Sequence, residues 1–401
     1  MSLTTATSSE ATTRPSPRLL GWYVLLSIGL LVGIASFAYQ WQSGLGVTGL
    51  TNASTWGLYI VVFMFLVGIS AGGLIVVAGS ELVNSHRFEP LSRLAVIVSG
   101  TAVLGAAISI IPDLGRPQQA WAMMVSPQPM SPLVWDMAVI TIYLTIAAID
   151  LWILTRPTPM PRTLRRMAIL TLPVAVLVHS VTAWIFGFLV ARPFWNTAIL
   201  APLFISSALV SGTALVLVVT WLTARTTAWR PPRTVYEDLA RLLVWFVAVD
   251  LFLLATELIT AYTSQTAYHL APLEMLFTGR LAPLFWSQLV LGVAVPLAIY
   301  ATPALRRRTP LVVAAAALSI LGVFAKRVNI LMPGMYDPQI ALEPGIPLGR
   351  AGEGFGIDTL YVPTWVEYGV MVGLFAFLAL LITLGVRRWV VPQAAGVDEG
   401  R

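Results

Sequence analysis

A single histidine lies in the middle of a long apolar run, where an ionisable side chain is costly. His179 is thirteen residues from Arg166 and thirteen from Arg192, the charges on either side of the run. At about 1.5 Å per helical residue the imidazole is roughly 20 Å from each charge, near the centre of a bilayer-length helix. Such a group is a candidate for proton exchange, but Ser180 and Thr182 leave a hydrogen bond between helices equally open.

Two carboxylates occur near the ends of other apolar runs. Asp113 and Arg116 lie three residues apart between two prolines, whereas Asp136 follows Trp135 at the start of the next run. Asp113 and Arg116 could pair and stiffen a turn, or they could shape a polar mouth over a pocket at membrane depth. For the second case we predict Asp113, Asp136 and His179 as the catalytic, proton-exchanging residues.

Aromatic and cationic side chains accompany these acids, and we predict that they bind a cofactor: Trp56, Tyr59, Arg116, Trp135 and Arg192. A redox-active quinone needs an apolar slot, hydrogen-bond donors at its carbonyls and a titratable neighbour. We therefore expect menaquinone or ubiquinone. Aromatic residues are also common at membrane interfaces, so the aromatics alone are weak evidence.

Four further acids are candidates for a proton path. Asp250 and Glu257 are seven residues apart and share a helix face, so a proton relay and a polar contact between helices are both open. Glu81 and Asp150 lie near the other membrane surface. For this pair we favour solvation at the interface, for instance beside Arg156.

Three polar residues, Lys326, Arg327 and Asn329, are expected to end one apolar run, and Glu367 to begin the next. Pairing between these two helix ends is the simplest interpretation. In an earlier run, Gly68-Ile-Ser-Ala-Gly-Gly73 forms a face of small residues. This face favours close helix packing, and it could also leave room for a flat ring.

The composition excludes an ordinary soluble domain, since 57% of the residues are hydrophobic and 10% charged, against about 25% charged in soluble domains. We predict an all-α, polytopic integral membrane protein. Cysteine is absent, which excludes an iron–sulfur cluster held by this chain. Of three histidines, His86 lies in a loop and His269 beyond a helix end, so we expect neither haem nor a metal site.

Ten apolar runs of bilayer length are expected, near 19–40, 56–80, 93–112, 133–154, 166–190, 198–222, 239–262, 284–304, 310–330 and 363–386. Sorting the 24 Lys and Arg residues by alternate loops puts eighteen on one side and six on the other. This bias predicts that both termini are cytoplasmic and that the candidate site faces outward. Arginines dispersed in short loops are not a nucleic-acid surface.

The expected organisation is two four-helix bundles with two flanking helices. The segments are a disordered tail (1–18), a first helix and outer loop (19–55), a bundle with the quinone site (56–190), a second bundle (191–330), an outer loop (331–362), and a last helix with a cytoplasmic tail (363–401). The first run is too long for a typical signal peptide, so we retain it as an anchor. The loop 331–362 is either a docking surface or a plain linker.

Several motifs together resemble the NrfD/polysulfide-reductase membrane subunit family over most of 50–380. They are Trp56-Gly-Leu-Tyr59, Gly68-Ile-Ser-Ala-Gly-Gly73, Pro112-Asp-Leu-Gly-Arg-Pro117, Ser131-Pro-x-x-Trp-Asp136, His179 to Gly187, and Ala191-Arg-Pro193. The ten spans fit the longer branch of that family. The start of the second helix, Ile60 to Leu66, is more apolar here than in members that place a His or Asn at this level.

The resemblance implies a haem-free, quinone-binding subunit of a prokaryotic inner-membrane oxidoreductase. It would exchange electrons with a ferredoxin-like iron–sulfur subunit, which serves a molybdopterin catalytic subunit of the dimethyl-sulfoxide-reductase type. The quinone would bind near the outer face of the first bundle. The alternative is a proton-coupled secondary transporter, for which paired, Gly/Pro-broken helices in the two halves are typical.

Overall fold

The protein is described from a computed structural model, over residues 17–51, 54–83, 86–156, 160–335 and 361–391. Every regular element in these ranges is helical, and ten helices are long and apolar enough to cross a membrane. The prediction of an all-α, polytopic membrane protein with ten spans is therefore confirmed. The expected tail 1–18 falls almost wholly outside the described residues, as does most of the loop 331–362.

Nine of the ten spans each contain one long helix: α1 (Pro17–Ser43), α2 (Leu58–Leu82), α3 (Ser92–Ile110), α5 (Pro132–Leu154), α6 (Pro161–Gly187), α7 (Leu200–Thr226), α8 (Thr234–Thr263), α13 (Thr309–Gly334) and α14 (Trp365–Gly385). Helix α14 continues as the π-helix η6 (Val386–Val390). The remaining span consists of α10 (Ala282–Ser287), the π-helix η5 (Gln288–Ala294) and α11 (Val295–Ala301). Short elements join them: η1 (Leu45–Val47), η2 (His86–Leu91), η3 (Ile111–Asp113), η4 (Pro117–Gln119), α4 (Ala122–Val125), α9 (Ala267–Phe277) and α12 (Pro303–Arg306).

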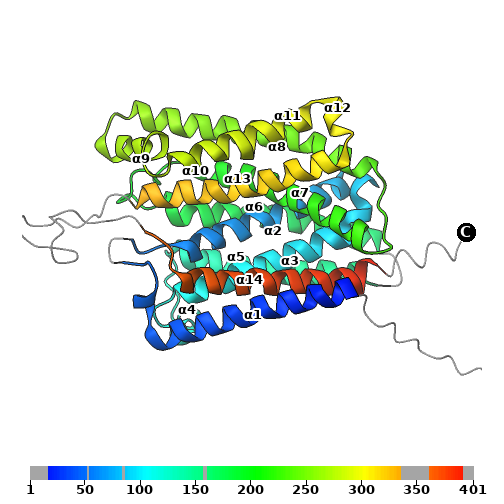
Figure 1. Cartoon of the computed structure of the whole chain (residues 1–401), viewed down its shortest axis with the longest axis horizontal. Coiled ribbons are helices and arrows are strands. Elements are labelled where there is room, and N and C mark those ends of the chain that lie inside the picture. The colour runs from blue at the N-terminus through cyan, green and yellow to red at the C-terminus, as the bar shows by residue number, and fades with distance from the viewer. Residues whose placement is uncertain (1–16, 52–53, 84–85, 157–159, 336–360, 392–401) are drawn as a thin grey trace, which may run out of the picture.

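Helix α2 is the centre of the molecule. It is apolar on all sides and almost entirely buried, as expected for a helix surrounded by other helices. It packs against α3, α6 and α7, and α3 and α6 both pack against α5. Helices α2, α3, α5 and α6 form a first group. Helices α7, α8 and α13 together with η5 and α11 form a second group, and the two groups meet where α7 packs against α2 and α6 (Figure 1).

The first and last spans lie side by side at one edge of the molecule (Figure 1). Two glycines allow this close approach, because a Cβ added to Gly33 of α1 would lie 3.0 Å from the backbone nitrogen of Gly373 in α14. Helix α14 also packs against α3. The pair thus attaches to the first group of helices.

The small-residue face of α2 is a packing surface. A Cβ added to Gly72 would meet the backbone of Ala208 in α7 and lie 3.0 Å from the Cα of Gly212. A Cβ on Gly212 would lie 2.6 Å from the Cα of Gly72. The packing interpretation of this motif is therefore confirmed, since no space remains between the two backbones for a flat ring.

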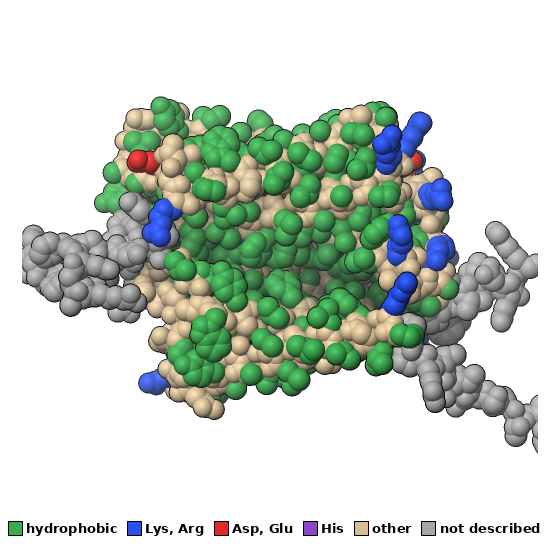
Figure 2. All heavy atoms as spheres, viewed as in Figure 1, with side chains coloured by type: hydrophobic (Ala, Val, Ile, Leu, Met, Phe, Trp, Pro, Cys, Tyr) green, Lys and Arg blue, Asp and Glu red, His purple; other side chains and the backbone are tan. Residues whose placement is uncertain are grey.

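The two ends of the helix bundle differ in charge. Lys and Arg side chains gather at the end where Figure 1 places α12 and the end of α14, while few are seen at the other end (Figure 2). We call these the arginine-rich end and the opposite end. The sequence predicts that they face the cytoplasm and the outside, respectively.

Candidate functional site

Asp113 lies at the opposite end of the bundle, in η3 directly after α3. Its Oδ1 atom is buried and has no hydrogen-bond partner among the described residues. Arg116 is exposed and forms no ion pair with Asp113 in the part of the chain described. Of the two alternatives, the pair that stiffens the turn is therefore wrong. A buried carboxylate oxygen without a partner is costly, which makes this position a candidate for contact with a ligand or water.

A chain of hydrogen bonds leads from Tyr59 to the residue before Asp113. The Tyr59 hydroxyl donates to Oε1 of Gln40 in α1, and Nε2 of Gln40 donates to the Pro112 carbonyl at 2.6 Å. Gln40 and Pro112 also line a mainly polar cavity of about 90 Å³ between α1 and the loop after α3. Sequence reasoning did not select Gln40, because the sequence does not show that α1 lies beside the loop after α3.

A second polar group covers the start of α2. The Tyr361 hydroxyl donates to Glu367 of α14 and accepts the backbone N–H of Leu58 at 2.8 Å. Oε2 of Glu367 accepts the N–H groups of Gly49 and Thr364, at 2.7 and 2.9 Å. Burial and the neighbouring Glu367 raise the pKa of Tyr361, so this hydroxyl remains a donor at neutral pH.

Asp136 is buried where α5 and α6 meet. Its Oδ1 accepts the Thr182 hydroxyl at 2.6 Å, and the exposed fraction of Asp136 is 3%. The Thr182 hydroxyl also contacts its own helix at the Val178 carbonyl. Trp135 points elsewhere, since its indole N–H donates to the Pro129 carbonyl. No contact among the described residues joins Asp136 to Asp113.

His179 faces the glycine-rich part of α2. Its Nδ1 lies 2.9 Å from the Ala175 carbonyl of its own helix, and Nε2 lies 3.4 Å from the Gly68 carbonyl. The ring is buried, with 1% of its surface exposed. Two carbonyls near the two ring nitrogens hold the imidazole in place, so the expected contact between helices is present here.

Trp56 belongs to an aromatic cluster rather than to the Asp113 region. Its ring stacks on Trp195 at 5.7 Å and contacts the edge of Phe186 at 5.2 Å. The Trp195 indole N–H donates to the Ile330 carbonyl of α13 at 2.7 Å. Trp56 and Tyr59 therefore contact different neighbours, and the predicted site is not one compact cluster.

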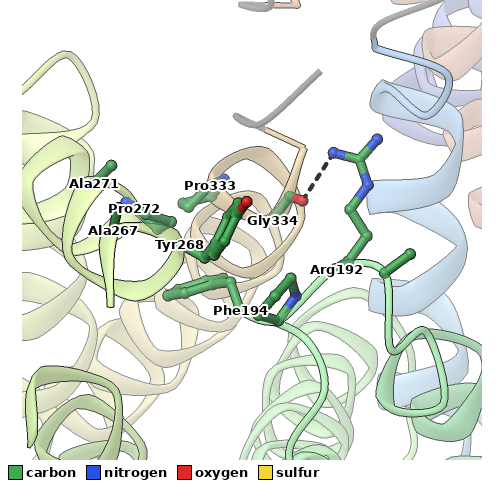
Figure 3. Close-up of a pocket in the computed structure, with 10 residues that line it drawn as sticks. Arg192, Phe194, Ala267, Tyr268, Ala271, Pro272, Pro333 and Gly334 are labelled. Atoms are coloured by element: carbon green, nitrogen blue, oxygen red, sulfur yellow. Dashed lines mark hydrogen bonds between the residues drawn. The ribbon is translucent and has the colours of Figure 1, made fainter. Parts of the chain in front are cut away.

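Arg192 lines a mostly apolar cavity of about 230 Å³ at the opposite end of the bundle (Figure 3). Its guanidinium donates to the Gly334 carbonyl at 3.3 Å, while Phe194, Tyr268 and Pro333 form the other walls. This cavity lies between the α6–α7 loop, α9 and the end of α13. Sequence reasoning missed it, because α9 is too short to be read from the apolar runs.

Glu81 and Asp150 line one small cavity of about 30 Å³ between α2, α3, α5 and α6. Asp150 is buried and accepts the Thr171 hydroxyl at 3.0 Å, and its Oδ1 is buried without a partner among the described residues. Arg156 lies instead over the Trp152 ring. Solvation of Asp150 beside Arg156 is therefore wrong, and the cavity has the size and polarity to hold a water molecule.

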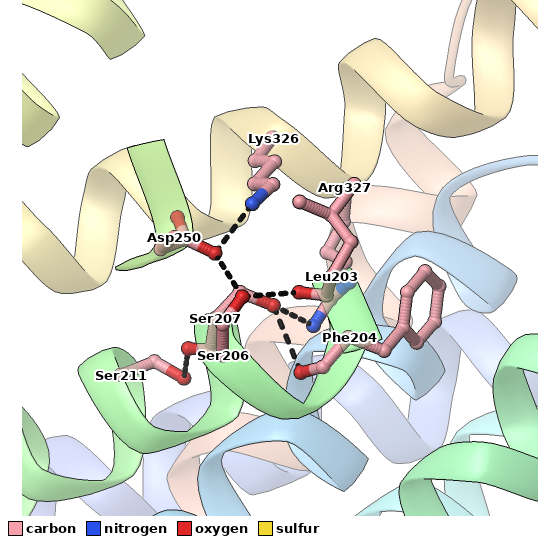
Figure 4. A network of polar contacts seen from close by, with 8 residues as sticks. All are labelled: Leu203, Phe204, Ser206, Ser207, Ser211, Asp250, Lys326 and Arg327. Atoms are coloured by element: carbon pink, nitrogen blue, oxygen red, sulfur yellow. Dashed lines mark hydrogen bonds and ion pairs between the residues drawn. The ribbon is translucent and has the colours of Figure 1, made fainter. Parts of the chain in front are cut away.

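Asp250 takes part in a polar network inside the second group of helices (Figure 4). Its Oδ1 lies 2.6 Å from Nζ of Lys326 and accepts the Ser206 hydroxyl at 2.8 Å. Next to it, Nη2 of Arg327 donates to the Ser207 hydroxyl at 2.7 Å, and the guanidinium lies 4.0 Å from the centre of the Phe204 ring. The network thus joins α7, α8 and α13.

This network corrects two expectations. Lys326 and Arg327 lie inside α13, which continues to Gly334, and they pair with α7 and α8 rather than with Glu367. They are also not loop cations, which lowers the count assigned to the outer side from six to four. Two adjacent basic residues within an apolar run were the signal for a buried network.

Glu257 lies beside this network. It accepts the Thr197 hydroxyl at 3.0 Å and lines a cavity of about 40 Å³ with Gln288, Lys326 and Asn329. Asn329 donates to Gln288 at 2.7 Å, but its own Oδ1 is buried without a partner among the described residues. A water in this cavity would connect Glu257 to the Lys326–Asp250 pair.

The structure thus distributes the predicted residues over separate places. Asp113 and Tyr59 are near Gln40, Asp136 is with Thr182, and His179 is with Gly68. The four acids predicted for the proton path lie in two groups. Glu81 shares a cavity with Asp150, and Glu257 shares another with Lys326, the partner of Asp250. No group of three potential metal ligands is found within the described residues.

Comparison with known proteins shows similarity over nearly the full chain. The family described as "Polysulphide reductase, NrfD" matches residues 46–338. A putative dimethyl sulfoxide reductase membrane subunit of Halobacterium salinarum is 36% identical, covering 95% of this chain and 94% of that protein. The Hdr-like menaquinol oxidoreductase integral membrane subunit of Archaeoglobus fulgidus is 27% identical (94% and 95%), and a selenate reductase subunit of Mesobacillus selenatarsenatis is 25% identical (91% and 93%).

Proposed function

Because the chain belongs to the NrfD family, we propose that it is the quinone-binding membrane subunit of a multi-subunit oxidoreductase. It exchanges electrons between the membrane quinone pool and a ferredoxin-like iron–sulfur subunit, which serves a molybdopterin catalytic subunit. The names of the relatives support this proposal, since they are subunits of a dimethyl sulfoxide reductase, a menaquinol oxidoreductase and a selenate reductase. We take menaquinone as the first candidate on the same ground.

The observation that carries the proposal is the unpartnered Oδ1 of Asp113, beside the Tyr59–Gln40–Pro112 chain. A quinone supplies two carbonyls that gain protons on reduction and lose them on oxidation. The shielded oxygen of Asp113, which accepts from no protein donor among the described residues, supports a role for this carboxyl in holding or accepting such a proton. The polar cavity lined by Gln40 adjoins this loop.

Asp136 and His179 have secondary roles in this proposal. Each is buried and already hydrogen-bonded to a neighbouring helix, Asp136 to Thr182 and His179 to Gly68. Asp136 lies on α5, while His179 on α6 contacts α2 and not the loop that carries Asp113. We therefore propose that His179 positions α6 against α2 and passes protons only after the Asp113 step.

The acids near the two small cavities form the proposed proton path. In the first bundle, protons pass through Glu81 and Asp150 near the arginine-rich end. In the second bundle, they pass between Glu257 and Asp250 by way of Lys326. Each cavity is large enough for a water molecule, which would bridge carboxylates that are too far apart for direct proton transfer.

The test is the substitution of Asp113→Asn, Asp136→Asn and His179→Ala in the assembled complex. Quinol-linked turnover and electron transfer from the soluble subunits to an artificial dye are measured separately. A quinone site near Asp113 predicts that Asp113→Asn loses the first activity and keeps the second. Glu274→Gln, an exposed acid on α9, is the matched control. Wild-type quinone kinetics in all three variants would place the site elsewhere.

The alternative, a proton-coupled transporter, is less well supported. Transporters of that kind typically have broken helices at matching places in the two halves of the chain. The span 282–301 contains the π-helix η5, but among the described residues no π-helix interrupts a span of the first bundle. Uptake of a solute into vesicles that contain the purified chain alone would favour the transporter.

A further inference from the structure

A large groove opens at the arginine-rich end of the bundle, away from the quinone and proton-path residues. Its volume is about 820 Å³, and it lies between the end of α7, the loop to α8 and the start of α13. Five arginines from these segments line it: Arg225, Arg230, Arg233, Arg307 and Arg308. No Asp or Glu is among the described residues that line it, so the groove is strongly positive.

The positive charge of the groove is not neutralised by the protein itself. Glu237 and Asp238, the nearest acids along α8, pair with Arg241 outside the groove, at 4.0 and 3.3 Å. None of the five groove arginines forms an ion pair with a residue that the structure describes. Five exposed guanidinium groups thus surround one open volume, which favours an external anion.

The groove also has an apolar part that a simple anion would leave uncovered. Trp221 and Leu311, from the membrane-spanning helices α7 and α13, line it together with Tyr236 of α8. The Arg225 guanidinium lies 4.9 Å from the centre of the Trp221 ring. Arginines above aromatic and aliphatic side chains at the end of a span are the arrangement that lipid headgroups and the first carbons of their chains encounter.

We propose that this groove binds the headgroup of an anionic phospholipid from the membrane leaflet at the arginine-rich end. Guanidinium groups bind phosphate oxygens in a bidentate manner, and arginines from two separate loops can contact one phosphate or two. The lipid would connect the α7–α8 loop to the start of α13. The excess of Lys and Arg in cytoplasmic loops sets the orientation of a membrane protein, but it requires neither a shared groove nor apolar side chains within it. It therefore does not explain why five arginines from separate segments line one groove.

The experiment measures lipid retention by the full-length chain. Protein purified in mild detergent is mixed with phosphatidylglycerol, cardiolipin or phosphatidylcholine, and bound lipid is counted by native mass spectrometry. We compare the wild type with the triple variant Arg233→Gln, Arg307→Gln, Arg308→Gln. The matched control removes three exposed charges from the start of α6 at the same end, by Arg162→Gln, Arg165→Gln and Arg166→Gln.

We expect the wild type and the control to retain the anionic lipids and not phosphatidylcholine. The groove variant should bind them at least about tenfold more weakly, since each basic residue near an anionic headgroup contributes strongly. Preference for cardiolipin over phosphatidylglycerol would indicate that two phosphates are bound. If the triple variant does not fold, Arg307→Gln and Arg308→Gln are tested singly, each with an expected loss of about fivefold.

Three results would overturn the proposal. Equal retention by the groove variant and the control would mean that the arginines act only in topology. Displacement of the lipid by equimolar inorganic phosphate would identify a plain anion site. Loss of partner subunits from the complex, with lipid retention unchanged, would identify the groove as a protein docking surface. None of these results depends on quinone turnover, so the proposed function is tested separately.

Discussion

The Nζ atom of Lys326 lies 2.6 Å from Oδ1 of Asp250, and both side chains are almost fully shielded from solvent. The two residues belong to α13 and α8, and Ser206 of α7 donates to the same carboxylate oxygen. Removing one partner of a buried ion pair destabilises a protein more than replacing both, because the single remaining charge is buried without a counter-charge. The ion pair can therefore be tested by comparing the stability of a single variant with that of the double variant.

We predict that Asp250→Asn destabilises the chain by about 3 kcal/mol, because it leaves the Lys326 ammonium buried without its counter-charge. The double variant Asp250→Asn with Lys326→Met should recover most of that loss. The measurement is thermal unfolding of the purified chain in detergent, followed by tryptophan fluorescence. A double variant less stable than Asp250→Asn would show that Lys326 has a separate structural role.

Proton coupling gives a second prediction. Glu257→Gln should lower the number of protons moved per quinol in the assembled complex, since it removes the carboxylate next to the Lys326 cavity. Dye-linked electron transfer should stay unchanged, and so should thermal stability, because a glutamine can still accept from Thr197. Glu274→Gln on the exposed face of α9 is the control. Unchanged proton stoichiometry would make Glu257 a structural residue.

The contact between α2 and α7 is tested with two glycines of the same helix. Gly72→Ala should sharply lower the yield of folded protein, because the new Cβ would meet the backbone of α7 at Ala208. Gly79→Ala should be neutral or stabilise by up to about 1 kcal/mol, since nothing lies within 4 Å of the added Cβ. Equal yields of the two variants would contradict the close approach.

Tyr361→Phe removes the hydroxyl that joins Glu367 to the start of α2. We expect a loss of about 1–2 kcal/mol in the free energy of unfolding, because the Leu58 N–H and one Glu367 oxygen lose their partner. Tyr368→Phe is the matched control, since Tyr368 is exposed on the same helix as Glu367. An equal change in both variants would argue against the bridge.

The same hydroxyl gives a prediction on pH. Folding raises the pKa of Tyr361 above its ordinary value of 10.0, so its contribution is fully present below about pH 10 and is lost as the pH rises further. The wild type should therefore lose stability above about pH 10 more steeply than Tyr361→Phe. Parallel pH profiles of the two proteins would contradict the assignment.

Orientation in the membrane is a prediction from the cation distribution. Reporter fusions after positions 45, 195 and 345 should report the periplasm, and fusions after 160 and 230 the cytoplasm. The reassignment of Lys326 and Arg327 to a buried network strengthens this expectation, because fewer cations then remain in the outer loops. The reverse labelling at 195 would move the Asp113 region to the other side of the membrane.

The ten spans could be predicted because length and apolar character alone decide whether a segment crosses a bilayer. The π-helix η5 and the short helix α9 could not be predicted, since neither interrupts or extends an apolar run in a recognisable way. Helix bounds were less predictable than the spans themselves. Helix α6, predicted over 166–190, runs from Pro161 to Gly187, and α13, predicted over 310–330, extends to Gly334.

The candidate site was only partly predictable, because the sequence shows depth but not which neighbour a side chain faces. Tyr59 and Trp56 are three residues apart, yet Tyr59 contacts Gln40 of α1, whereas Trp56 contacts Trp195 of the α6–α7 loop. Asp250 was selected as an intramembrane acid, but its partner Lys326 is 76 residues away. Pairing between distant helices requires the packing to be known.

The neighbourhood of α1 has a consequence for biosynthesis. The main contact of this helix is with α14, which is made much later in synthesis, and Gly33 of α1 meets Gly373 of that helix. During synthesis the helix α1 therefore exists long before its partner does. A chain interrupted before Trp365 would leave α1 without its neighbour, so this edge of the molecule can close only after α14 has been inserted.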